Sequence, residues 1–173
     1  YIGDWSSDVC SSDLSAAEKC KDKIGDKWEG FANFWRTTQL EYTWLRSLMK
    51  RHKDFWQVTE ESLDKSMKTY EIDSSMRSEL LDLYKILSTF KEVPEVLKSL
   101  KEKNFKLAIL SNGTPALLNQ LVKSNNLDNL FDDLFSIEEV GIYKPDSKVY
   151  DIPINKYQIQ KNEIAFLSAN TWD

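Results

Sequence analysis

A short apolar run that ends in polar residues occurs three times in the second half of the chain, and this pattern strongly limits the fold. The runs cover residues 105–110, 130–137 and 164–167, and helical periodicity lies between them. Short apolar runs bounded by turn residues are typical of strands buried on both faces. Strands that alternate with helices form a parallel sheet. The pattern therefore predicts an α/β fold with a doubly wound parallel sheet.

The first half of the chain is predicted to be helical. Apolar residues recur at helical spacing over residues 28–49, 55–70 and 74–90, with charged residues between them. Pro94 and Pro115 stand where the first turns of two further helices would begin, because a first turn leaves its N–H groups unpaired in any case. Another helix is expected from Ser147. We therefore expect a helical subdomain at residues 15–92 and an α/β core at residues 93–173.

Composition excludes several classes of function. The chain has 28 Asp+Glu against 23 Lys+Arg, a formal net charge of −5, which argues against a nucleic-acid partner because phosphate backbones are bound by clustered basic residues. His52 is the only histidine, which argues against His-rich zinc sites and HExxH proteases. No apolar run approaches the roughly 18 residues that span a membrane, and two cysteines cannot build a disulfide framework. We expect a cytoplasmic protein without a membrane partner.

Polar clusters follow the apolar runs, and the carboxyl ends of parallel strands are where such sheets bind ligands. The clusters are SNGT at 111–114, YKPD at 143–146 and SANTWD at 168–173. Ser111 and Asn112 can cradle an anion or a carboxylate, or can form an ordinary turn. Pro145 restricts Lys144, and a fixed lysine can hold a neighbouring carboxylate ionised as a nucleophile. The alternative for Lys144 is a solvated turn residue.

Four segments carry a resemblance to a known family. They are WRTTQLEYTWLRSLMKRHKDF at 35–55, LAILSNGTP at 107–115, YKPDSKVYD at 143–151 and IAFLSANTWD at 164–173. With these segments in this order the chain resembles the haloacid dehalogenase superfamily, and within it the L-2-haloacid dehalogenases, also called (S)-2-haloacid dehalogenases. The resemblance covers about Trp28 to Asp173. It implies a Rossmann-like core with a helical cap subdomain.

The resemblance also implies a reaction, in which L-2-haloacids are hydrolysed to D-2-hydroxyacids through an aspartyl-ester intermediate without a metal or another cofactor. It implies that Arg36 and Asn112 assist the departing halide, that Ser111 holds the substrate carboxylate and that Lys144 keeps the nucleophilic carboxylate charged. Residues implied to order this lysine and the hydrolytic water are Tyr150, Ser168, Asn170 and Asp173. Residues implied to form an apolar wall around the substrate are Leu40, Phe55 and Trp172. The partner would be a small-molecule 2-haloacid, and relatives with this cap are commonly homodimers.

The first fourteen residues, YIGDWSSDVCSSDL, depart from the family. They show no helical or strand period, so no element is expected there, and DWSSDVCSSDL resembles the translation of a sequencing-library adaptor. The family's first strand and its nucleophile loop, of the form DxYGTL, do not occur, and Asp4, Asp8 and Asp13 follow no apolar strand. Pro153 interrupts a stretch that is helical in the family, and relatives continue beyond Asp173. We therefore expect an internal piece of the enzyme that lacks the nucleophile and is inactive.

Two other interpretations stay open. A phosphatase of the same superfamily would need Mg²⁺ held by acidic residues at the third cluster. Ser168 stands where the first of these acids is usual, which leaves Asp173 alone and favours the dehalogenase. The other alternative is a non-catalytic fragment that binds nothing specific.

Overall fold

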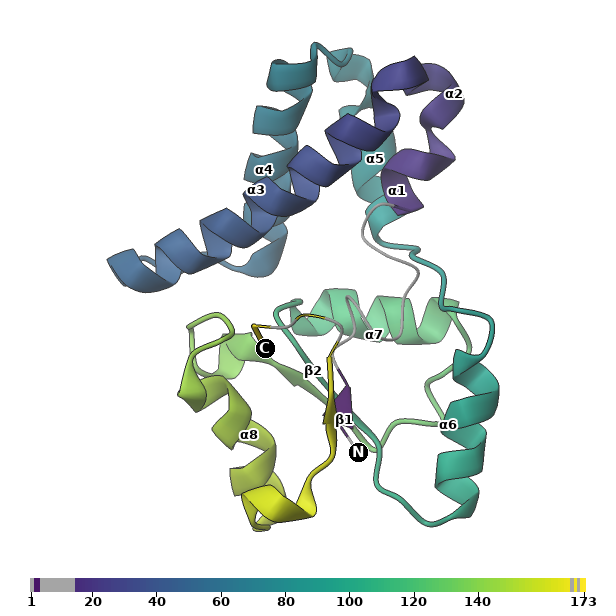
Figure 1. The fold of residues 1–173 in the computed structure, drawn as a ribbon, viewed down its shortest axis with the longest axis vertical. Helices are drawn as coiled ribbons and strands as arrows, with labels where there is room; N and C mark the ends of the chain where they lie inside the picture. The colour runs from purple at the N-terminus through teal and green to yellow at the C-terminus, as the bar shows by residue number, and fades with distance from the viewer. Residues whose placement is uncertain (1, 4–14, 169, 171) are drawn as a thin grey trace.

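The computed structural model of the chain describes residues 2–3, 15–168, 170 and 172–173. Its strands are β1 (Ile2–Gly3), β2 (Ala108–Ser111), β3 (Asp133–Ser136) and β4 (Phe166–Leu167). Its α-helices are α1 (Ser15–Lys19), α2 (Lys21–Ile24), α3 (Trp28–Met49), α4 (Phe55–Tyr70), α5 (Arg77–Tyr84), α6 (Val93–Glu102), α7 (Pro115–Ser124) and α8 (Ser147–Tyr157). Short 3-10 helices are η2 (Gly25–Lys27), η3 (Ser74–Met76), η4 (Ile137–Glu139) and η5 (Lys161–Glu163). Figure 1 shows α1–α5 gathered in one part and α6–α8 around the sheet in the other.

The sheet is parallel throughout, in the order β3-β2-β1-β4. The predicted α/β class is therefore confirmed. The prediction that the first fourteen residues form no element is wrong at Ile2–Gly3, which lie between β2 and β4 in register with Ala108–Ile109 on one side. A strand of two residues is too short to show a period of two, and its pairing depends on main-chain hydrogen bonds rather than on side-chain pattern.

The strand β1 also corrects an expectation about the carboxylates near the N-terminus. Asp4 comes directly after Ile2 and Gly3 of β1 in the sequence, so the expectation that Asp4, Asp8 and Asp13 follow no apolar strand is wrong for Asp4. The three aspartates themselves lie outside the described residues.

The two long helices of the first half, α3 and α4, have the predicted bounds and pack against each other. The third predicted helix, over residues 74–90, was too long, because η3 and α5 end at Tyr84. Beyond it the chain passes to the core, where the Thr89 amide donates to Asn125 Oδ1 at 3.0 Å. The helices α1 and α2 were missed, since segments of five and four residues are too short to show helical periodicity.

Prolines begin two helices and lie inside a third. Pro94 and Pro115 occupy first turns, as predicted. Pro153 does not interrupt α8, which runs from Ser147 to Tyr157, so that expectation is wrong. An internal proline removes one main-chain hydrogen bond. The burial of Val149, Ile152 and Pro153 against the core offsets this loss.

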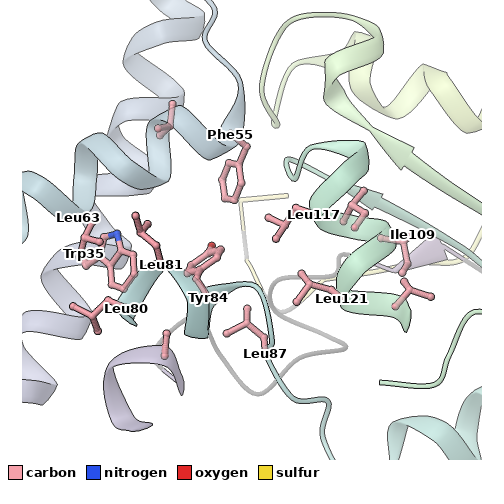
Figure 2. Close-up of a cluster of buried hydrophobic side chains, with 14 of the residues drawn as sticks. Trp35, Phe55, Leu63, Leu80, Leu81, Tyr84, Leu87, Ile109, Leu117 and Leu121 are labelled. Carbon is pink, nitrogen blue, oxygen red and sulfur yellow. The ribbon is translucent and has the colours of Figure 1, made fainter. Parts of the chain in front are cut away.

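One cluster of buried apolar side chains extends through both parts of the molecule. Figure 2 shows Phe55, Tyr84 and Leu87 between the helical part, where Trp35 and Leu63 lie, and Leu117 and Leu121 of α7. The helical part and the sheet part therefore pack against each other through these side chains, and a cavity lies between the two parts. None of the helices in the described part of the chain combines the length and apolar composition needed to cross a bilayer.

Candidate active site

Parallel pairing brings the predicted polar clusters to one edge of the sheet. Ser111 ends β2, and Ser168 follows directly after β4. The YKPD segment leads from η4 to α8, whose first amides are capped by Asp146, because its Oδ1 accepts from the Lys148 amide at 2.9 Å. The three clusters are therefore neighbours in space, as their positions after the strands predict.

A buried ion pair is the centre of the polar network. Lys144 Nζ lies 2.7 Å from Asp173 Oδ2, and the two side chains are 1% and 0% exposed. The Ser168 hydroxyl donates to the same oxygen at 2.9 Å, and the Tyr150 hydroxyl donates to Asp173 Oδ1. A buried charge is tolerated only when it is paired and hydrogen-bonded, and Asp173 meets both conditions. Lys144 is thus a fixed, buried cation and not a solvated turn residue.

Asn112 connects this network to the end of β2. Its side-chain Oδ1 accepts from the Lys144 amide at 3.2 Å. Ser111 Oγ accepts from the Gly113 amide at 3.0 Å, and the Ser136 hydroxyl donates to the Gly113 carbonyl at 2.6 Å. Ser111 and Asn112 are both buried, at 4% and 8% exposure. The loop after β2 is therefore held in one arrangement by β3 and by the YKPD segment.

A cavity lies between this loop and the helical part. Seven of the predicted site residues line it: Arg36, Leu40, Phe55, Ser111, Asn112, Asn170 and Trp172. Its remaining lining is mostly apolar and comes from Tyr84, Leu87, Gly113, Leu117, Leu118 and Leu121. A mainly apolar cavity with a few convergent polar groups is typical of a small-molecule site. The cation Arg36 faces it from α3, and hydroxyl and amide groups face it from the sheet.

The other four predicted residues, Lys144, Tyr150, Ser168 and Asp173, form the network beside this cavity. Hydrogen bonds join the two sets of residues. Asn112 accepts from the Lys144 amide, the Asn170 amide donates to Ser168 Oγ at 3.2 Å, and the Asp173 amide donates to the Asn170 carbonyl at 3.2 Å. Trp172 lines the cavity and also a second one that includes Lys144 and Trp44. The rings of Trp44 and Trp172 meet edge to face, with centroids 5.5 Å apart.

Sequence reasoning missed the group that orients Arg36. Arg36 Nη1 donates to Gln39 Oε1 at 3.3 Å, and Gln39 Nε2 donates to Thr59 Oγ1 at 2.7 Å and to the Tyr84 hydroxyl at 3.1 Å. Gln39 is 1% exposed. The only signal in the sequence is its spacing of three from Arg36, which places both on one helix face. Thr59 and Tyr84 come from other helices and give no such signal.

Metal ligands are not gathered in the described residues. Within residues 15–168 and the described positions after them, no three His, Cys, Asp or Glu side chains are arranged to hold an ion. His52, the only histidine of the sequence, instead lies 2.8 Å from Glu138 Oε2 through its Nε2.

Known proteins are similar to this chain in sequence and in fold. The family described as haloacid dehalogenase-like hydrolase matches residues 33–173. An (S)-2-haloacid dehalogenase of Pseudomonas sp. (strain YL) is 39% identical over 161 residues, which cover 92% of this chain and 69% of that protein. The (S)-2-haloacid dehalogenase 4A of Burkholderia cepacia is 36% identical over 161 residues, which cover 92% of this chain and 70% of that protein.

A solved structure extends the comparison to three dimensions. It is the L-2-haloacid dehalogenase of Xanthobacter autotrophicus with chloropropionic acid covalently bound. It is 30% identical, has a TM-score of 0.90, and the match covers 99% of this chain and 70% of that one.

Proposed function

Because this chain belongs to the haloacid dehalogenase-like hydrolases, and within them to the (S)-2-haloacid dehalogenases, we propose that its cavity binds an L-2-haloacid for hydrolysis to the D-2-hydroxyacid. The observation that carries the proposal is the composition of the cavity. Arg36, Ser111 and Asn112 all line it, and its apolar lining includes Phe55 and Trp172. A haloacid needs these three features, namely donors for its carboxylate, an apolar wall for its carbon chain and a cation for the departing halide.

The proposed reaction has two steps. An aspartate oxygen attacks C2 of the substrate, and the electron pair of the carbon–halogen bond leaves with the halide, so that the configuration at C2 inverts. Water then adds to the carbonyl carbon of the aspartyl ester, which releases the hydroxyacid and a proton and restores the carboxylate. The relative from Xanthobacter autotrophicus, solved with chloropropionic acid covalently bound, supports a covalent intermediate.

The roles of individual residues are part of the proposal. Arg36, oriented by Gln39, would stabilise the halide as it gains charge, together with the Asn112 amide. The Ser111 hydroxyl would donate to the substrate carboxylate. Lys144, fixed by Asp173, would reduce the repulsion between the two carboxylates that must meet. Tyr150, Ser168 and Asn170 would order the water through the same network, and Leu40 would add to the apolar wall.

We propose further that the chain of 173 residues does not itself turn over substrate. Its segment DWSSDVCSSDL contains carboxylates but not the DxYGTL loop of the family it resembles. For tests of catalysis we therefore define the loop-restored chain, in which a family first strand ending in DxYGTL replaces residues 1–14.

The loop-restored chain is expected to release chloride from L-2-chloropropionate at the same rate with EDTA as without it. The reason is that Ser168 occupies the position where a metal-binding acid would be needed. Ion chromatography measures the chloride, with added Mg²⁺ and p-nitrophenyl phosphate as comparisons. Loss of activity in EDTA, or faster hydrolysis of the phosphate ester, would overturn the assignment in favour of the phosphatase.

Other expectations from the sequence and its resemblance stay predictions. They are the homodimer, the cytoplasmic location, the absence of nucleic-acid and membrane partners, and the division of the chain at residues 92 and 93.

A further inference from the structure

Glu138, a residue of the core, contacts His52 in the connection between α3 and α4 and also Phe55 at the start of α4. Its Oε2 lies 2.8 Å from His52 Nε2, and its Oε1 accepts from the Phe55 amide at 3.3 Å. Glu138 belongs to η4, directly after β3, and its own amide donates to Ser136 Oγ at 3.2 Å. The carboxylate is therefore fixed to the sheet at one end and to the helical part at the other.

The charge of Glu138 suits this position. Phe55 is the first residue of α4, and the N-terminus of a helix carries a partial positive charge that favours a carboxylate. Asp54 is the N-cap of this first turn, since its Oδ1 accepts from the Gln57 amide at 2.8 Å. Glu138 supplies a second acceptor, from the core, for the Phe55 amide, which the helix itself cannot satisfy. The side chains of His52 and Glu138 are 27% and 23% exposed, so water screens their contact only in part.

Tyr143 holds the same connection from the other side. Its hydroxyl donates to the Lys53 carbonyl at 2.6 Å, and its amide donates to Ser47 Oγ at 3.2 Å. Burial, with a smaller contribution from the negative charge of Glu138, raises the pKa of Tyr143, so the phenol stays a donor at neutral pH. The chain from Ser47 to Phe55 is thus attached to the core at several points close to the cavity.

Phe55 connects the attached segment with the cavity, because its side chain forms part of the cavity lining. It is 5% exposed and lines the cavity with Arg36 and Trp172. Figure 2 shows its ring between Tyr84 on the helical side and Leu117 of α7. We propose that Glu138 is a positioning residue, which holds the start of α4 so that the Phe55 ring forms one wall of the 2-haloacid site. The ligand in this proposal rests on the proposed function, whereas the contact between Glu138 and Phe55 does not.

Amide hydrogen exchange in the chain of 173 residues tests the contact. Glu138→Ala is expected to speed exchange of the Phe55 amide about tenfold, the size of effect for one lost hydrogen bond to a charged group. Glu138→Gln keeps an acceptor and is expected to stay within about threefold of the unsubstituted chain. The matched control is Glu139→Ala, because Glu139 is exposed on the same turn. Unchanged exchange in Glu138→Ala would overturn the proposal.

Binding of L-2-chloropropionate, followed by tryptophan fluorescence, tests the consequence. Glu138→Ala is expected to weaken binding about fivefold, with Glu138→Gln and Glu139→Ala within about twofold, which are order-of-magnitude estimates from one displaced contact. Faster exchange with unaltered binding would refute a positioning role. If the unsubstituted chain binds no 2-haloacid, the proposed function and the ligand named here both fail, and the exchange result still decides whether Glu138 holds Phe55.

Discussion

Lys144→Ala is expected to lower the free energy of unfolding of this chain by about 3 kcal/mol, because it leaves the Asp173 carboxylate buried without its cation. Lys148→Ala is the matched control, since Lys148 is an exposed lysine of the same segment and its loss is expected to change stability by less than about 0.5 kcal/mol. Urea titration followed by tryptophan fluorescence measures both variants. Similar losses at the two positions would contradict the special role of Lys144.

The same substitution is expected to reduce kcat of the loop-restored chain at least roughly 100-fold, the scale at which one charged group stabilises a transition state. Lys148→Ala is expected to leave kcat within about twofold of the unsubstituted protein. Halide release at saturating L-2-chloropropionate is the measurement. A proportional fall in the amount of folded protein would explain part of the loss, so rates are compared per folded molecule, as determined from the urea curves.

A double variant tests whether Lys144 and Asp173 contribute to stability as a pair. Asp173→Asn alone leaves Lys144 buried without its carboxylate, and we expect it also to destabilise the chain. Combining it with Lys144→Ala removes both charges, and the combined loss is expected to be smaller than the two single losses added together. Additive losses would mean that the two side chains do not act as a pair.

The long periodic helices and the strands β2, β3 and β4 were predictable from the sequence, whereas β1, α1 and α2 were not. The helices α3 and α4 bury one face against each other over 22 and 16 residues, so their apolar spacing carries a strong signal. The strand β1 has two residues and depends on partners that lie more than 100 positions away, β2 and β4. Main-chain pairing of this kind leaves no pattern in its own residues.

The candidate site divides in the same way. Ser111, Lys144 and Ser168 were predicted to lie together because polar residues beyond buried strands meet at one edge of a parallel sheet, and the structure brings their clusters together. Gln39 and Glu138 contact side chains from other elements, Thr59 and His52, and no pattern near Gln39 or Glu138 in the sequence predicts these contacts. Candidate ligand-binding residues can thus be predicted from strand ends and from resemblance, whereas the residues that contact and orient them become visible only in the fold.

The chain of 173 residues is expected to release no halide from L-2-chloropropionate above the buffer rate. A nucleophilic carboxylate must lie about 3–3.5 Å from the carbon that it attacks. Asp4 follows β1 and matches the first position of DxYGTL, but Ser6, Ser7 and Asp8 stand where that pattern has Tyr, Gly and Thr. The segment after Asp4 therefore differs in sequence from the family loop at three consecutive positions.

Ion chromatography measures halide release by the purified chain. Asp22→Asn is the control, because Asp22 is an exposed carboxylate on α2. Release above buffer that Asp4→Asn abolishes, and Asp22→Asn does not, would identify Asp4 as the nucleophile and show that β1 suffices to place it. Release abolished by Asp13→Asn instead would identify Asp13, at the other end of the adaptor-like segment, as the nucleophile. Arg36 and Lys144 can stabilise a departing halide, but they cannot form the ester bond, because neither side chain carries the carboxylate that the reaction requires. If neither variant abolishes a release above buffer, the chain has no identified nucleophile.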